Sequence, residues 1–207
     1  MRTILKNIFI LCFFISCTSN KKFLPFYNTS DFTPHFLNEV PDDYHHIRGF
    51  NLLTHTGKNI TEKDMDGKIT VADFFFARCP GICPRMTTNM KVLQDSFLTD
   101  DRILLLSHSV TPDNDSVPVL KKFADEHQVN DRRWLLITGS KNEIYNLGRK
   151  YYFVEEDLGE KRDTSEFLHT ENFVLVDTKR RIRGIYNGLN LSSIKNLIRD
   201  IKELEKE

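Results

Sequence analysis

The chain has 207 residues, and its 29 lysines and arginines balance 29 aspartates and glutamates, so the formal net charge is zero. This balance disfavours a basic nucleic-acid-binding protein, and we expect no nucleic-acid partner. A hydrophobic content of 40% with 28% charged residues disfavours disorder and a polytopic membrane protein, and four cysteines are too few for a disulfide-stapled fold.

Residues 1–16 have the pattern of a secretory signal peptide. Arg2 and Lys6 precede an unbroken apolar run, Ile8–Ile15, which is too short to span a bilayer of roughly 30 Å as a helix. Cys17 resembles the lipidated first residue of a bacterial lipoprotein; the alternative is an ordinary signal peptide with a chance cysteine. We therefore expect a domain that is lipid-anchored to a membrane of the bacterial cell envelope, on its extracytoplasmic side.

Residues 17–43 are polar, proline-dotted and without a clear period, and they predict a tether between the lipid and the folded part. Residues 44–207 are predicted to form one domain. After cleavage and lipidation this domain keeps two free cysteines, Cys79 and Cys83. In an oxidising compartment two such thiols either form a disulfide or bind a metal.

Strands and helices alternate along the predicted domain. Two short runs around Thr56-Gly57 predict a hairpin, and Ser140 with Glu143 predicts a capping box at a helix start. Apolar runs predict buried strands, and apolar residues at helical spacing predict helices. The predicted strands are Lys68–Phe76, Ile103–Val110, Trp134–Thr138, Phe173–Asp177 and Ile182–Tyr186, and the predicted helices lie within Met86–Phe97, Pro118–Val129, Ser140–Lys150 and Leu191–Leu204.

This order predicts an α/β fold with a mostly parallel central sheet, helices on both of its faces and an N-terminal β-hairpin. The last two strands must be antiparallel, because only a tight turn at Thr178–Arg181 joins them. A cysteine motif at the junction of the first central strand and its helix is a thioredoxin-like arrangement.

The motif CPGICP places Cys79 at the carboxyl end of the first central strand and Cys83 at the start of a helix. Ligands bind at this edge of open α/β sheets, and the free N–H groups of a helix N-terminus stabilise thiolates. Three residues separate the cysteines, where the usual thioredoxin dithiol motif has two. Two thiolates suit Cu(I) or Zn(II) but do not close a metal site, so a third ligand should exist.

Seven histidines are candidates for that ligand. His169 stands just before the strand Phe173–Asp177, although a loop before a parallel strand does not normally reach the carboxyl edge of the sheet. His108 lies within a buried strand and is interpreted as a core residue. The others lie in the predicted tether, before the hairpin, in a turn or late in a helix: His35, His45, His46, His55 and His127.

Three separated segments, FFFARCPGICPRM, WLLITG and FLHTENFVLVD, resemble the Sco/SenC family of copper-binding, thioredoxin-like cytochrome oxidase assembly proteins. The resemblance covers about residues 45–205 and keeps the family's eight-residue interval between a histidine and an aspartate, here His169 and Asp177. It implies that Cys79, Cys83 and His169 bind a copper ion. It also implies that the partner is the copper-centre subunit of a respiratory haem-copper oxidase.

One departure from the family lies in the segment SVTPDND, where Thr111 replaces the aspartate of an Asp-Pro pair. Asp113 and Asp115 lie close enough to substitute for it. A solvated turn and a helix N-cap are the favoured interpretation of these two aspartates.

Four further residues near the motif have two interpretations each. Arg78 and Arg85 either lower the thiol pKa values and dock an acidic partner, or are plain surface charges. Met86 and Met90 are thioether copper ligands or core residues, and their four-residue spacing on an apolar helix face favours the core.

The leading hypothesis is a membrane-tethered copper metallochaperone in which reduced Cys79 and Cys83, with His169, hold copper, and in which a Cys79–Cys83 disulfide abolishes binding. The alternative is a thiol–disulfide oxidoreductase with the two cysteines as its redox-active pair, which does not need His169. A thiol peroxidase with Cys79 as its nucleophile ranks lower, because Ala77 stands where a peroxide-activating threonine is expected. Whether the protein is an enzyme stays open.

Overall fold

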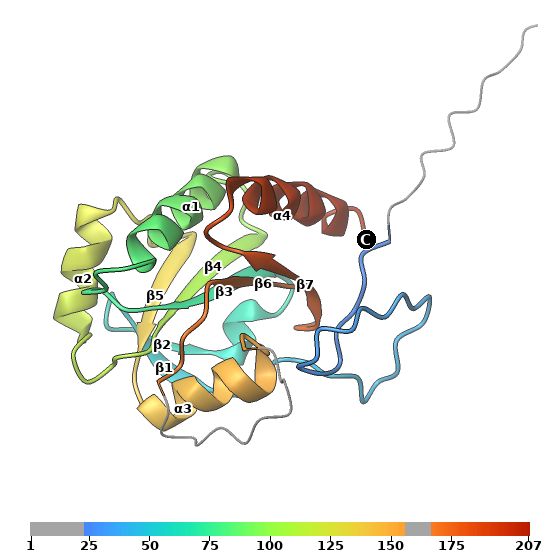
Figure 1. The fold of residues 1–207 in the computed structure, drawn as a ribbon, viewed down its shortest axis with the longest axis horizontal. Coiled ribbons are helices and arrows are strands. Elements are labelled where there is room, and N and C mark those ends of the chain that lie inside the picture. The colour runs from blue at the N-terminus through green and yellow to red at the C-terminus, as the bar shows by residue number, and fades with distance from the viewer. Residues whose placement is uncertain (1–22, 156–166) are drawn as a thin grey trace, which may run out of the picture.

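The computed structural model describes residues 23–155 and 167–207, which form a seven-stranded sheet flanked by helices (Figure 1). The strand order in the sheet is β2-β1-β5-β4-β3-β6-β7. The strands are β1 (Asn51–Thr54), β2 (Asn59–Thr61), β3 (Ile69–Phe75), β4 (Ile103–Ser109), β5 (Trp134–Thr138), β6 (Asn172–Val176) and β7 (Ile182–Asn187). The helices are α1 (Cys83–Ser96), α2 (Val117–Glu126), α3 (Lys141–Asn146), which continues as a π turn over Leu147–Tyr151, and α4 (Leu191–Leu204), with a 3-10 turn at Glu62–Met65.

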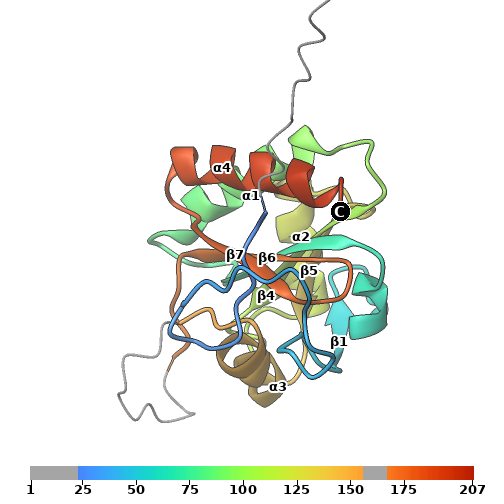
Figure 2. The ribbon, with the colours of Figure 1, turned by 90° about the vertical axis from the view of Figure 1, so that its right-hand side faces the viewer.

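Helices cover both faces of the sheet, as predicted. On one face, Met90 of α1, Leu120 of α2 and Leu197 of α4 belong to a single apolar core. On the other face, Ile144 of α3 packs in a second core with Leu52 of the hairpin. Figures 1 and 2 show α1 and α4 on the side of the sheet away from α3. Because both faces are covered, every residue of β3 is buried, and its sequence is a nearly continuous apolar run.

The prediction of a mostly parallel sheet is wrong. Among the described strands, β3 and β5 pair with β4 in parallel, whereas β1–β2, β1–β5, β3–β6 and β6–β7 are antiparallel. The hairpin adds β1 to β5 in the antiparallel sense. β6 is antiparallel to β3 because the connection from Tyr151 to Asn172 brings the chain back to the carboxyl end of β3, and not to the amino end as a β-α-β crossover would. The antiparallel pairing of β6 with β7 confirms the predicted turn.

Half of the predicted capping box at α3 is present. The Ser140 hydroxyl accepts the Glu143 backbone N–H at 3.4 Å, as in an N-cap. The Glu143 carboxylate, however, accepts the backbone N–H of Asn51 at 2.7 Å. It therefore ties the start of α3 to the hairpin, and a tertiary contact has replaced the local one.

The predicted tether over residues 17–43 is not separate from the domain throughout, because its part around Leu24 and Phe26 packs on the domain. Leu24 and Phe26 are buried, and Phe26 forms a two-residue bridge with His35 in which both N–O distances are 2.8 Å. The predicted signal peptide and Cys17 lie outside the described residues.

Arg183 at the start of β7 fixes this segment. Its guanidinium donates to the backbone carbonyls of Leu24 and Pro25 at 2.9 and 3.1 Å, and lies 4.0 Å from the centre of the Phe26 ring. It also pairs with the Glu207 carboxylate at 2.6 Å. The start of β7 lies at the amino end of β3, so the segment joins the domain at the end opposite the cysteine motif.

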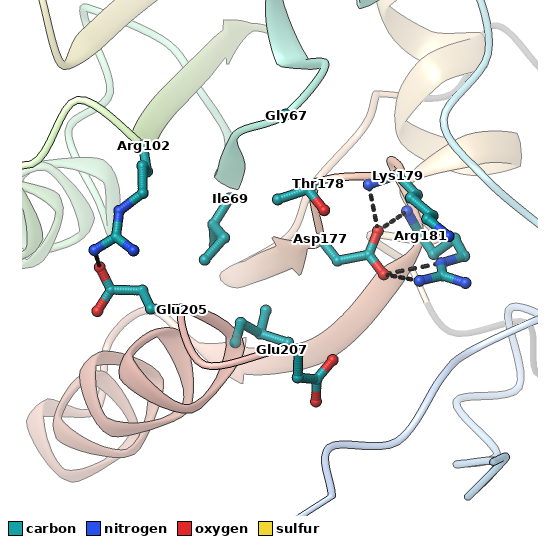
Figure 3. A pocket seen from close by; sticks show the side chains of 10 residues that line it. Gly67, Ile69, Arg102, Asp177, Thr178, Lys179, Arg181, Glu205 and Glu207 are labelled. Atoms are coloured by element: carbon teal, nitrogen blue, oxygen red, sulfur yellow. Dashed lines mark hydrogen bonds and ion pairs between the residues drawn. The ribbon is translucent and has the colours of Figure 1, made fainter.

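A hollow of about 320 Å³ opens at the same amino end (Figure 3). The two arginines that line this hollow are already paired, Arg102 with Glu205 and Arg181 with Asp177. Neither Cys79 nor Cys83 lines it. Within the described residues, no helix is both long and apolar enough to cross a membrane.

Candidate metal centre

Cys79 and Cys83 lie at the carboxyl end of β3, where the chain turns into α1. Cys83 is the first residue of α1 and is buried, whereas Cys79 is half-buried in the preceding loop. Ile82 at the N-cap of α1 has no side-chain acceptor for the first N–H groups of the helix. No side chain at the N-cap therefore competes with the sulfurs for these N–H groups, as the sequence predicts.

The two thiols are free and unequal. Burial alone would raise the pKa of the Cys79 thiol, but hydrogen bonds from the Cys83 thiol and from the backbone at Gly81, Ile82 and Cys83 outweigh it, so this pKa lies below its ordinary value. Burial, with the hydrogen bond to Cys79, raises the pKa of Cys83 to about 12. Cys79 is thus the more acidic thiol of the pair, and the Cys83 thiol donates to it.

His169 lies at the same end of the sheet because β6 is antiparallel to β3. The ladder pairs Thr70 with Val176 and Ala72 with Val174, so the segment that precedes β6 lies toward the carboxyl end of β3, where the cysteine motif begins. A side-chain contact agrees with this placement, since the rings of Phe76 and Phe167 meet edge to face with their centres 5.7 Å apart.

The structure does not assemble the three predicted ligands. Over residues 23–155 and 167–207, no three His, Cys, Asp or Glu side chains are grouped so as to hold a metal ion. The His169 side chain is exposed, and its backbone N–H donates to the Glu155 carboxylate at 3.2 Å. The fold therefore brings the backbone of His169 to the cysteine end of the sheet without placing its ring on the sulfurs.

A model of the SCO1/SenC family matches residues 38–206. The chain belongs to the SCO1/SenC family. It is 31% identical to the SCO1 protein homolog of Bacillus subtilis over 160 residues, which are 75% of this chain and 81% of that protein. It is 27% identical to the mitochondrial SCO1 homolog 1 of Arabidopsis thaliana over 130 residues, which are 61% of this chain but 37% of that relative.

Solved structures of the family share the fold. A SCO1/SenC family lipoprotein from Bacillus anthracis is 29% identical with a TM-score of 0.65, over 78% of this chain and 95% of that one. BsSco, a member of the Sco family of cytochrome c oxidase assembly proteins with a disulfide switch, is 28% identical with a TM-score of 0.66, over 82% and 99%. Copper-bound ScoI of Arabidopsis thaliana is 23% identical with a TM-score of 0.59, over 77% and 98%. These likenesses confirm the predicted thioredoxin-like fold.

Asp73 is a buried acid that influences the cysteine pair and that the sequence patterns did not single out. Asp73 lies in the middle of β3, on the face that carries Phe75, and is 2% exposed. Burial raises its pKa to about 7, and its charge is one of the influences that raise the pKa of Cys83. A lone acid inside the apolar run KITVADFFF is the signal that should have drawn attention to it.

Asp115 also differs from its favoured interpretation. It is buried, and its carboxylate accepts hydrogen bonds from the Ala77 backbone and the Ser109 and Thr111 hydroxyls, so it is neither a solvated turn residue nor the N-cap of α2, which is Ser116. Asp113, in contrast, is exposed as expected.

The remaining candidates near the motif behave as ordinary structural residues. Met86 and Met90 are fully buried in the core under α1, which confirms their interpretation as packing residues. Arg78 and Arg85 are exposed, and the influences that lower the Cys79 pKa come from Cys83 and the backbone. His108 is a buried core residue, as predicted.

Proposed function

We propose that this chain binds copper and passes it to the copper-centre subunit of a respiratory haem-copper oxidase, and that a lipid on Cys17 anchors it on the extracytoplasmic side of a bacterial membrane. The observation that carries the proposal is the pair of free thiols at the start of α1, one of which acidifies the other. The family supports it, since BsSco is a cytochrome c oxidase assembly protein and Arabidopsis ScoI binds copper.

The donor set fits Cu(I). Cys79 and Cys83 supply two adjacent soft sulfurs, and the N–H groups at the start of α1 favour their negative charge. His169 supplies the third ligand, an imidazole nitrogen, after a local movement of the residues around it toward Cys79. The antiparallel pairing of β6 with β3 supports this role, because the segment before β6 then lies toward the end of the sheet that carries Cys79.

An incomplete, partly exposed site suits a protein that must release its metal. Cys79 is half-buried, so a thiol or imidazole of the acceptor can reach copper before the donor ligands leave. Oxidation of the two thiols to a disulfide releases two protons and passes two electrons to an oxidising disulfide, and it removes both thiolate ligands at once. Copper binding thus requires the reduced pair.

The test is a Cu(I) titration of the reduced mature chain against a chromophoric chelator. We expect one copper per chain, loss of binding in Cys79→Ser and Cys83→Ser, and a tenfold or larger loss of affinity in His169→Ala, on the order seen when a metal's coordination shell is disturbed. His127→Ala, at the end of α2, is the matched control and should bind as the unaltered chain does. An unchanged affinity in His169→Ala would remove the third ligand from the proposal.

The anchor has a separate test. In a bacterial host fed a clickable palmitate analogue, the full chain should be labelled and recovered with membranes, and Cys17→Ser should be unlabelled. Labelling that survives this substitution would refute the lipid on Cys17.

The inequality of the thiols favours a second candidate, a thiol–disulfide oxidoreductase. The Cys79 thiolate attacks a substrate disulfide and displaces one substrate thiolate; Cys83, after losing its proton, attacks the Cys79 sulfur and displaces the other. The substrate ends as two thiols and the chain as a Cys79–Cys83 disulfide, which a thiol donor must reduce again. Fast exchange by the metal-free chain, with His169→Ala fully active, would favour this function.

A further inference from the structure

The Asp115 carboxylate lies between the ends of two neighbouring strands. One of its oxygens, Oδ2, accepts three hydrogen bonds: from the Ser109 hydroxyl at 2.6 Å, from the Thr111 hydroxyl at 3.0 Å and from the Ala77 backbone N–H at 3.1 Å. Asp115 is 1% exposed. Ser109 ends β4 and Ala77 follows β3, so a single buried oxygen joins the two strand ends.

The bond to Ala77 lies where the sheet no longer holds the chain. The N–H of Val110 donates to the Phe75 carbonyl at 2.8 Å, which is the last sheet-like bond of β3. The N–H of Cys79 donates to the Phe76 carbonyl at 3.3 Å, which closes the turn before the motif. Between these two anchors the N–H of Ala77 points to Asp115. The bond to Asp115 is therefore the side-chain contact at the point where the loop leaves the sheet, two residues before Cys79.

We propose that Asp115 is a positioning residue for the Cys79–Cys83 pair. Its carboxylate holds the backbone at Ala77 so that the Cys79 sulfur stays within reach of the Cys83 thiol. The effect of Asp115 on copper affinity rests on the proposed function. Its effect on the dithiol–disulfide equilibrium does not depend on that function.

The chemistry of the position requires an acid. Three donors converge on one oxygen, and a carboxylate oxygen binds such donors more strongly than a neutral amide oxygen does. The Thr111 hydroxyl, which stands where the family has the aspartate of its Asp-Pro pair, is one of these donors. Asp115 thus provides the one acidic group in this cluster of hydrogen bonds, and Thr111 helps to orient it.

Two measurements on Asp115→Ala and Asp115→Asn test the proposal. The first is Cu(I) affinity by chelator competition, and the second is the midpoint potential of the metal-free Cys79–Cys83 pair, equilibrated in mixtures of reduced and oxidised dithiothreitol. Asp115→Ala should weaken Cu(I) binding about tenfold or more. It should also make the disulfide about tenfold less favourable, a rise of about 30 mV, because a looser loop lowers the effective concentration of one thiol near the other.

Asp115→Asn should shift both quantities in the same direction by a smaller amount, because its amide oxygen keeps an acceptor at this place without the charge. Two controls separate the bond to Ala77 from its surroundings. Asp113→Ala removes an exposed acid two residues away, and Thr111→Val removes one donor but leaves the bond to Ala77. Asp113→Ala should stay close to the unaltered chain, and Thr111→Val should shift both quantities less than Asp115→Ala does.

Several results would overturn the inference. One is an Asp115→Ala variant that melts at a lower temperature yet keeps its Cu(I) affinity and its potential, since Asp115 would then be structural only. Another is a Thr111→Val variant with an equal loss. If Asp115→Ala does not fold, Asp115→Asn decides, and unchanged values in both measurements would reject the role. Failure of the unaltered chain to bind Cu(I) would count against the proposed function, while the potentials would still test Asp115.

Discussion

Ala72 of β3 lies opposite Val174 of β6 in an antiparallel ladder, and this one pairing decides where His169 lies. In a parallel arrangement the segment before β6 would meet the amino end of β3, away from the cysteines. With β6 reversed, the same segment arrives beside the loop that carries Cys79. A mainly local sequence motif and a distant histidine are thereby brought to one edge of the sheet.

The Phe76–Phe167 contact joins the segment before His169 to the motif, and its removal should weaken the part proposed for His169 in copper binding. Edge-to-face aromatic pairs contribute about 0.5–1.5 kcal/mol, so we expect Phe167→Ala to lower copper affinity by about two- to tenfold. Cu(II) loaded on the variant should show weaker nitrogen coupling in electron paramagnetic resonance. Phe36→Ala, which removes another exposed phenylalanine, is the control. Equal copper signals from both variants would contradict a holding role for Phe167.

Asp73 should make the reduced domain less stable as the pH rises. Its pKa is raised from 3.8 to about 7 in the folded chain, so between these values the unfolded chain loses the proton and the folded chain keeps it. The free energy of unfolding then falls with increasing pH and levels off above pH 7. Asp73→Asn should unfold at higher urea concentration at pH 8, with a gain of up to about 4 kcal/mol, and should match the unaltered chain near pH 3. Parallel pH profiles for the two chains would refute this account.

His108 should destabilise the domain in acid. Burial lowers its pKa from 6.5 to about 4, so below pH 6.5 the unfolded chain gains a proton that the folded chain does not, and stability falls until about pH 4. Within the described residues neither ring nitrogen has a hydrogen-bond partner, and the ring stacks on Phe74.

The test is His108→Leu, which replaces the imidazole by an apolar side chain of similar size. At pH 7 its stability should lie within about 1.5 kcal/mol of the unaltered chain, since the swap conserves volume. At pH 4.5 it should be more stable by about 2–3 kcal/mol, measured by urea unfolding. An acid transition unchanged by this substitution would show that other groups cause it.

Arg183 should be essential for docking of the N-terminal segment. Arg183→Met leaves the Glu207 carboxylate and the Leu24 and Pro25 carbonyls without their donor, and breaking a buried ion pair costs about 3–5 kcal/mol. The variant should also be cut faster by chymotrypsin after Phe26, which is buried in the intact chain. Lys121→Ala, which breaks an exposed pair with Asp125, should change stability by no more than about 1 kcal/mol. Unchanged cleavage in Arg183→Met would contradict the docking role.

Local patterns in the sequence were sufficient for the elements and for the cysteine motif. The strand Trp134–Thr138 has the predicted bounds, and the placement of Cys79 and Cys83 at a strand end and a helix start is as expected. Each of these features depends on neighbours within a few residues. A continuous run of apolar residues indicates a buried strand, and the motif itself indicates the start of a helix.

The features that the sequence did not predict depend on contacts between distant parts of the chain. The direction of β6 is set by where the chain returns after α3, and no local period records that return. The burial of Asp115 depends on Ala77, which lies 38 residues earlier. The packing of Leu24 and Phe26 was not predicted, because it depends on Arg183, which lies 159 residues after Leu24 and binds its carbonyl.

The docking of the N-terminal segment also bears on where copper would be exchanged under the proposed function. Seven residue steps separate Cys17 from Leu24, and they span at most about 25 Å when fully extended. A lipid on Cys17 would therefore keep the base of the domain, where Arg183 lies, close to the headgroups. Cys79 is at the opposite end of β3. If β3 points away from the bilayer, the distance from the membrane to the two thiols is about the length of the domain. An acceptor would have to offer its copper ligands at that height above the bilayer, on the part of its structure that projects from the membrane.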